Sequence, residues 1–201
     1  MLTLNVDNFC SSCATQMAVT SPEAISGLQR LLNFMVLDPD LSDIRWAAYM
    51  LATVKHECAN QWQPVEEFGK GKNKPYGKPA AVSDADGTTY SNTYYGRGYV
   101  QLTWRRNYDT MGRNLGMGNG LVLHPEHALE PGTAYQIMSY GMRHGSFTGV
   151  GLHRYIYDVT CDYVNARRII NGTDRAELIA GYAKDIEALL RKSVDAKAVG
   201  A

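Results

Sequence analysis

The chain has 201 residues, of which 45% are hydrophobic and 20% are charged, and its 20 basic residues balance 20 acidic ones. This length suits one folded domain, and the composition is unlike that of disordered, collagen-like or membrane-spanning chains. Because the net charge is zero, the chain has no overall attraction to nucleic acid or to an anionic membrane. We therefore expect neither as a partner.

Residues 1–20 are expected to be an N-terminal extension of the domain. They contain no basic stretch followed by an apolar run, so they do not encode a signal peptide. Cys10 and Cys13 form a C-x-x-C pair, but no second pair of ligands follows at the spacing of a zinc site. We expect no metal and no cofactor, and the cysteine pattern fits folding in a reducing cytoplasm.

The first two predicted helices cover about residues 22–36 and 44–58. Ser21 is a suitable N-cap, Pro22 suits the first helical position, and apolar residues then recur at helical spacing. The second helix opens at Ser42 and Asp43 and carries an apolar stripe that ends near Cys58.

Residues 61–103 lose the helical period and are predicted to form a lobe of loops with a small β-hairpin. Asp86-Gly87 predicts a two-residue hairpin turn, whereas a calcium loop would need further ligands that are missing. The segment 68–79 carries four lysines among glycines and prolines. It is either a solvated loop or a local contact for a polyanion.

Four more helices are predicted after this lobe, at about residues 104–115, 131–143, 161–169 and 174–192. The fold class is therefore mainly α, with one loop and β-hairpin insert. Residues 1–201 are expected to form a single catalytic domain with no separate wall-binding module.

Glu57 is the first candidate for acid–base chemistry. His56-Glu57 resembles the start of a zinc-protease motif, but Asn60 stands where the second histidine would be. Glu57 instead ends an apolar helix face, where a desolvated carboxyl suits a general acid. The alternative is an ordinary acid that reaches solvent at a helix end.

Glu66 and Glu67 follow nine and ten residues after Glu57. An acid at a helix end that faces a carboxylate across a short loop is the pair that glycoside hydrolysis requires. Such pairs are also common in proteins without this activity, so the spacing alone leaves the interpretation open.

The segment TYYGRGYVQLTWRRNY at residues 93–108 concentrates aromatic and polar side chains. Tyr95 offers a flat face to a sugar ring, and Arg97 could hold an acid. Gln101, Thr103 and Asn107 offer hydrogen bonds to hydroxyl and N-acetyl groups. The alternative is a buried strand that runs into a helix, with the tyrosine in the core.

The motifs HE at 56–57, YYGRGYVQLTWRRNY at 94–108 and IINGTDR at 169–175 resemble family 19 glycoside hydrolases. That family contains plant-type chitinases and a branch of bacteriophage endolysins that cut peptidoglycan. The resemblance covers about residues 43–190. It implies a lysozyme-like, mainly helical fold with two lobes, a cleft between them, and hydrolysis with inversion.

The resemblance also implies roles for individual residues. Glu57 matches the general acid, and Thr103 matches the residue that helps to hold the catalytic water. Gln101, Asn107 and Asn171 match conserved motif positions that contact substrate. The second carboxylate is assigned first to Glu66 and second to Glu67.

The PVEEF segment, the cysteine positions and the lack of a chitin-binding module place the resemblance nearer to the endolysins than to plant chitinases. We expect a monomeric peptidoglycan hydrolase that cuts between alternating N-acetyl amino sugars. It would be made in the host cytoplasm and reach the wall through a holin or a secretion system. The alternatives are a chitinase and a non-catalytic wall-binding protein, and which glycosidic bond is cut stays open.

Overall fold

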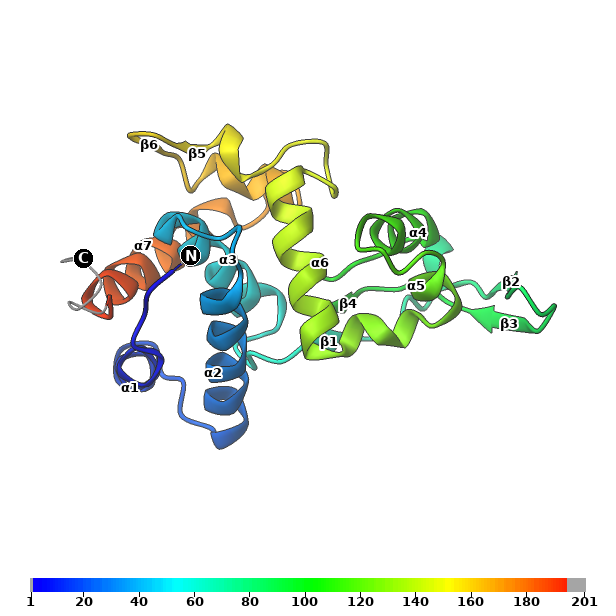
Figure 1. Ribbon diagram of the computed structural model, residues 1–201, viewed down its shortest axis with the longest axis horizontal. Coiled ribbons are helices and arrows are strands. Elements are labelled where there is room, and N and C mark those ends of the chain that lie inside the picture. Colours follow the sequence, from blue (N-terminus) through cyan, green and yellow to red (C-terminus); the bar gives the residue numbers. More distant parts are fainter. Residues whose placement is uncertain (1, 195–201) are drawn as a thin grey trace.

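The computed structural model describes residues 2–194 and shows two helical lobes (Figure 1). One lobe holds α1, α2, α3 and α7, the other holds α4, α5 and the β2–β3 hairpin, and α6 lies between them. None of the helices in the described range has the length and apolarity needed to cross a membrane. The predicted mainly α fold is confirmed.

Within this range the α-helices are α1 Val6–Gln16, α2 Pro22–Leu37, α3 Ile44–Glu57, α4 Arg105–Asn114, α5 Gly120–Leu123, α6 Pro131–His144 and α7 Ala176–Lys192. The strands are β1 Val65–Glu66, β2 Ala80–Ser83, β3 Thr89–Asn92, β4 Arg97–Gly98, β5 Ile156–Tyr157 and β6 Thr160–Cys161. The short 3-10 helices are η1 Pro75–Gly77, η2 Pro125–Leu129, η3 Leu152–Arg154 and η4 Asn165–Ile169.

Helices α2 and α3 begin as the sequence predicts. The Ser21 side chain accepts a hydrogen bond from the backbone N–H of Ala24 at 3.1 Å, and Pro22 opens α2. Asp43 caps α3 in the same way. Residues 47–54 of α3 are buried, because α7 and α6 pack against the faces that a surface helix would expose. Helix α3 therefore ends, at Glu57, inside the molecule.

The N-terminal region, which the sequence predicted as an extension of the domain, is helical. It contains α1, which packs against α2 and α7 and buries Cys10 and Cys13. Burial raises the pKa of the Cys10 thiol to about 11 and that of Cys13 to about 12. Both thiols therefore stay protonated near neutral pH and are poor metal ligands and poor nucleophiles.

The predicted hairpin in the 61–103 lobe is confirmed as β2 and β3, but its turn is longer than two residues. The last strand pair is Ser83 with Thr89, and Asp84 closes the turn by accepting hydrogen bonds from the N–H groups of Asp86 and Thr88. A second antiparallel pair, β1 with β4, brings residues 65–66 against 97–98. That pair fixes the position of both candidate carboxylates.

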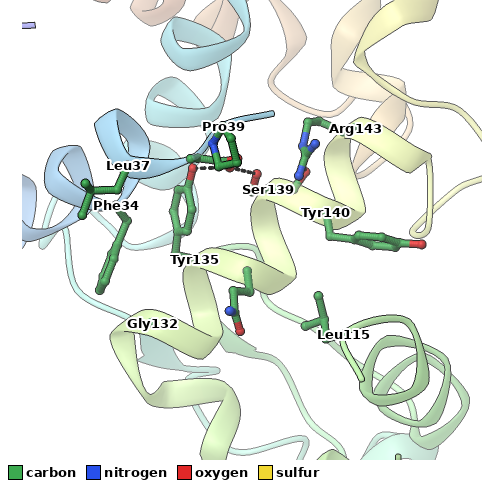
Figure 2. Close-up of a pocket in the computed structure, with 11 residues that line it drawn as sticks. Phe34, Leu37, Pro39, Leu115, Gly132, Tyr135, Ser139, Tyr140 and Arg143 are labelled. Carbon is green, nitrogen blue, oxygen red and sulfur yellow. Dashed lines mark hydrogen bonds between the residues drawn. The ribbon is translucent and has the colours of Figure 1, made fainter. Parts of the chain in front are cut away.

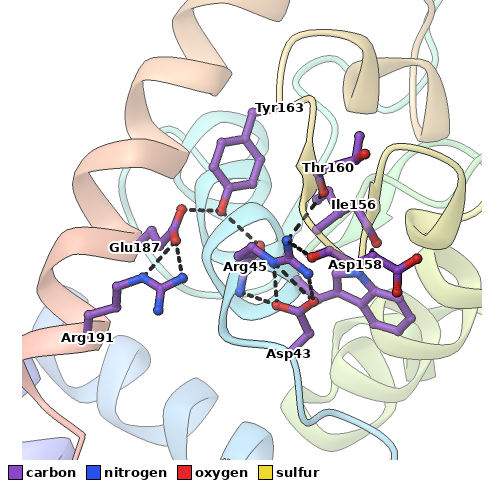
Figure 3. A network of polar contacts seen from close by, with 9 residues as sticks. Asp43, Arg45, Ile156, Asp158, Thr160, Tyr163, Glu187 and Arg191 are labelled. Atoms are coloured by element: carbon purple, nitrogen blue, oxygen red, sulfur yellow. Dashed lines mark hydrogen bonds and ion pairs between the residues drawn. The ribbon is translucent and has the colours of Figure 1, made fainter.

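The predicted helix at 161–169 is wrong. The chain forms the β5–β6 hairpin and then the 3-10 helix η4. The hairpin is attached to the start of α3, because the Arg45 guanidinium donates to the carbonyl of Asp158 at 2.8 Å and the Trp46 indole N–H donates to that of Ile156 at 2.9 Å (Figure 3). These long-range hydrogen bonds fix the carbonyl groups of the hairpin, and sequence periodicity does not reveal them.

Gly98, in β4, lies close to the backbone of η2. Its φ is +86°, and a Cβ placed there would lie 2.7 Å from the carbonyl oxygen of Ala128. Gly87, in the β2–β3 turn, has a similar φ of +84° but no atom within 4 Å of such a Cβ. The two glycines therefore share the backbone requirement and differ in the space around them.

We predict that Gly98→Ala lowers the free energy of unfolding by about 2–5 kcal/mol, because it combines left-handed strain with overpacking against a carbonyl. Gly87→Ala should cost only the backbone strain, about 1–2 kcal/mol. Thermal or urea unfolding of the two variants measures the difference. Equal losses would show that the contact with Ala128 does not constrain the fold.

Candidate active site

One cleft collects five of the side chains that the sequence singles out. It has a volume of about 360 Å³, and the five are Glu57, Gln101, Thr103, Asn107 and Asn171. The rest of its wall is formed by Tyr76, Val100, Leu102, Trp104, Phe147 and Ile170. These stretches are far apart in sequence, so the cleft exists only in the folded chain.

Glu57, the last residue of α3, reaches the cleft from one lobe. Its Oε1 accepts a hydrogen bond from Nη1 of Arg167 at 2.7 Å, and the exposed fractions of the two side chains are 17% and 2%. Arg167 lies in η4 and also donates to the carbonyl of Asp174 at 2.8 Å. The same turn places Asn171 in the cleft wall, since its N–H donates to the carbonyl of Arg167. Among residues 2–194, no hydrogen-bond donor reaches Oε2 of Glu57.

Residues 101–104 and Asn107 form another part of the wall, held by a tight set of local hydrogen bonds. Gln101 has a φ of +54°, and its side-chain amide donates to the carbonyls of Val65 and Gly98. The Thr103 hydroxyl donates to the carbonyl of Gln101 at 2.8 Å. Asn107 in turn donates to the carbonyl of Thr103 at 2.8 Å. The proton of the Thr103 hydroxyl is therefore engaged, and its lone pairs can accept a hydrogen bond from a molecule in the cleft.

Glu67 does not line the cleft, but it contacts a residue that does. Its Oε1 accepts a hydrogen bond from the hydroxyl of Tyr76 at 2.8 Å, and its Oε2 accepts one from the N–H of Gly96 at 3.0 Å. The side chain is half-buried. Glu67 therefore stands directly behind Tyr76 at the edge of the cleft.

Glu66 is held on the other side of its strand, because neighbouring residues of an extended chain point to opposite faces. Its carboxylate forms an ion pair with Lys70 at 2.7 Å and accepts a hydrogen bond from the Tyr95 hydroxyl at 2.5 Å. Those two contacts, that of Lys70 first, lower the pKa of Glu66 below its usual value. Neither Glu66 nor its two partners line the cleft.

Tyr95 and Arg97, which the sequence suggested as substrate contacts, lie outside the cleft wall. Both are 6% exposed, and the Arg97 guanidinium stacks on the Tyr95 ring at 3.7 Å from its centroid. Arg97 also donates to the carbonyl of Thr93 and to the hydroxyl of Tyr108. These contacts support the 93–108 segment on the side away from the cleft. The geometry therefore agrees with the alternative in which Tyr95 is a core residue.

Several residues of the site had no role predicted from the sequence. Trp104 is 49% exposed in the cleft wall and meets the Tyr76 ring edge-on, with centroids 5.1 Å apart. Its position directly after Thr103 in the sequence could have marked it as a residue of the site. Tyr76 was hidden in a segment read for its lysines, and Phe147 and Arg167 had no local pattern that marked them.

A second pocket, of about 340 Å³, lies between α2 and α6 (Figure 2). Its one carboxylate, Asp38, accepts hydrogen bonds from the hydroxyls of Tyr135 and Ser139, both at 2.7 Å. Burial alone would raise the pKa of Asp38, but these bonds bring it below its usual value. With a single, fully engaged carboxylate, this pocket does not offer the pair that acid–base cleavage of a glycoside needs.

No protein-family model matches the sequence, and no curated protein is significantly similar to it. Solved structures do resemble it. A bacterial family 19 chitinase matches with a TM-score of 0.60 and 20% identity, over 93% of this chain and 94% of the other. Chitinase C from Streptomyces griseus matches with a TM-score of 0.61 and 19% identity, over 95% and 78%. A class IV chitinase of the same family from Zea mays matches with a TM-score of 0.51 and 19% identity, over 92% and 90%.

At identities near 20%, this likeness establishes the fold. The match covers nearly the whole chain, including the elements that form the cleft. The chain therefore has the mainly helical fold of family 19 chitinases.

Proposed function

We propose that this chain is a glycoside hydrolase that cuts the glycan strands of peptidoglycan. The observation that carries the proposal is the cleft itself, whose wall brings together the Glu57 carboxyl, the hydroxyl of Thr103 and the amide of Asn107. The fold likeness to chitinases supports a glycosidase, although it does not select the substrate.

In the proposed reaction, Glu57 donates a proton to the glycosidic oxygen as the bond to the anomeric carbon breaks. Arg167 holds Oε1, so Oε2 is the atom that faces the substrate. A water molecule attacks the anomeric carbon from the opposite face, and its proton passes to a second carboxylate. Inversion requires the two carboxyl groups to stand about 6.5–9.5 Å apart, so that the water fits between them.

For the second carboxylate we propose Glu67 in place of Glu66, which the sequence had favoured. Glu67 contacts the cleft residue Tyr76, while Glu66 is bound to Lys70 on the far side of the strand. Tyr76 is half-buried, so its side chain can swing aside and release Oε1 of Glu67. The lone pairs of the Thr103 hydroxyl would hold the water from its other side.

The cleft offers contacts that suit an N-acetyl amino sugar. Trp104 and Tyr76 present aromatic surface, which packs on the apolar faces of sugar rings. Asn107 and Asn171 place amide groups in the cleft wall, where they can bind hydroxyl and N-acetyl groups. These contacts suit chitin as well as peptidoglycan.

The charge beside the cleft favours peptidoglycan. Lys72, Lys74 and Lys78 are exposed on the segment that carries Tyr76. Chitin is uncharged, whereas the peptide stems of peptidoglycan carry carboxylates, so a basic segment at the edge of the cleft attracts only the second polymer. Such an activity fits the endolysin branch that the motifs resemble, with access to the wall through a holin or a secretion system.

We predict that Glu57→Gln lowers the release of reducing ends from purified peptidoglycan by about 10²–10⁴-fold, the usual contribution of a general acid. The variant should fold, because the glutamine oxygen still accepts the hydrogen bond from Arg167. Glu177→Gln, an exposed acid in the first turn of α7, is the matched control. Undiminished activity of Glu57→Gln would remove the acid assignment, and wall binding by wild type without reducing ends would favour a non-catalytic protein.

We predict that Glu67→Gln loses a similar fraction of activity, while Glu66→Gln keeps most of it, because only Glu67 stands next to the cleft. Both variants should be assayed with the same wall preparation, and unfolding temperatures should be compared. The opposite result, with loss confined to Glu66→Gln, would restore the assignment made from sequence.

We predict that the double variant Lys72→Gln/Lys74→Gln raises KM for peptidoglycan several-fold at low ionic strength and leaves the hydrolysis of chitin oligomers unchanged, because only peptidoglycan is anionic. The difference should shrink as salt is added.

Wild type should degrade purified wall, and mass spectrometry of the fragments will identify the bond that is cut. Turnover of chitin with none of the wall would establish the chitinase alternative.

A further inference from the structure

His124, Glu126 and His127 form a cluster that the proposed reaction does not use. One ligand atom from each residue can be chosen so that all three lie within 4.8 Å of one another. None of them lines the cleft. Two imidazole nitrogens with a carboxylate oxygen are a ligand set typical of zinc and other late first-row metals, and not of magnesium or calcium.

One pair of ligand atoms has a separation that suits a shared ion better than a direct hydrogen bond. Nδ1 of His124 lies 3.4 Å from Oε1 of Glu126, which exceeds the usual N–H···O range of about 2.7–3.2 Å. Two ligands on a tetrahedral zinc ion, with bonds of about 2.0–2.1 Å, stand about 3.3–3.4 Å apart. The pair therefore already has the separation that zinc would impose.

Local backbone geometry brings the two histidines together. Pro125 opens the 3-10 helix η2, and in such a helix side chains three residues apart lie above one another. The rings of His124 and His127 are accordingly 5.2 Å apart and inclined by only 27°. Glu130 follows, with its Oε1 at 3.9 Å from Nε2 of His127, but it lies outside the group of three whose ligand atoms are mutually within 4.8 Å.

The neighbouring hairpin holds this segment in place. The Tyr90 ring of β3 meets the His124 ring edge-on, with centroids 5.5 Å apart. Asn92 of the same strand donates to the carbonyls of Val122 and Leu123, directly before His124. A ring and a backbone that are already oriented lose little freedom when an ion binds.

We propose that His124, Glu126 and His127 bind one zinc ion that stabilises the second lobe. Both histidine side chains are about 40% exposed, so the site is open to solvent and a water molecule completes the tetrahedron. The ion would brace η2, which packs behind β4 through the contact of Ala128 with Gly98. Because this role is structural, the proposal does not depend on the glycosidase activity.

The test is isothermal titration of the metal-stripped full-length protein with zinc chloride, in a Cys161→Ser background that removes the exposed thiol. We expect one site per chain and a rise of several degrees in Tm with saturating zinc, because an ion that binds only the folded state stabilises it. The double variant His124→Asn/His127→Asn should weaken the Kd by more than about tenfold, since it removes two of the three ligands.

His153→Asn, an exposed histidine in η3, is the matched control and should bind zinc like the parent. The Tm of each variant without metal shows whether its fold is intact. The proposal fails if the parent shows no saturable binding, or if the double variant and the control bind zinc equally well.

Discussion

The ion pair between Glu57 and Arg167 is the interaction on which the arrangement of the cleft depends. A guanidinium that is 2% exposed needs a partner, because an unpaired buried charge costs several kcal/mol. Arg167 also binds the carbonyl of Asp174, just before α7, and its own carbonyl holds the N–H of Asn171. One side chain therefore sets the end of α3, one wall of the cleft and the approach to α7 relative to each other.

The part of the wall formed by residues 101–104 depends on backbone turns that strain ordinary residues. Gln101 and Trp104 both have positive φ, which places consecutive side chains on a sharply curved segment. Behind it, the stacked pair of Arg97 and Tyr95 fills the space that a continuous strand would occupy. The motif thus divides its residues between two tasks: residues 100–104 and Asn107 line the cleft, whereas Tyr95 and Arg97 support the turn.

Periodic segments of the sequence predicted the fold well, and segments without a period did not. The apolar spacing after Pro22 and the stripe before Glu57 predicted α2 and α3 nearly to the residue, because burial of one helix face imposes that spacing. The expected helix at 161–169 failed because Arg45 and Trp46 hold the β5–β6 hairpin from more than a hundred residues away. Helix α1 was missed because its polar composition gave only a weak period.

The sequence by itself determined the helical architecture, the hairpin, and the types of side chain that a glycosidase cleft would need. Only the tertiary structure decided how these residues are used. Glu66 and Glu67 are chemically identical neighbours, and the pairing of β1 with β4 determines which of them turns toward Tyr76. In the same way, only folding brings Arg167 to Glu57. The physical reason is that orientation and charge pairing arise from contacts between distant segments, which no local pattern contains.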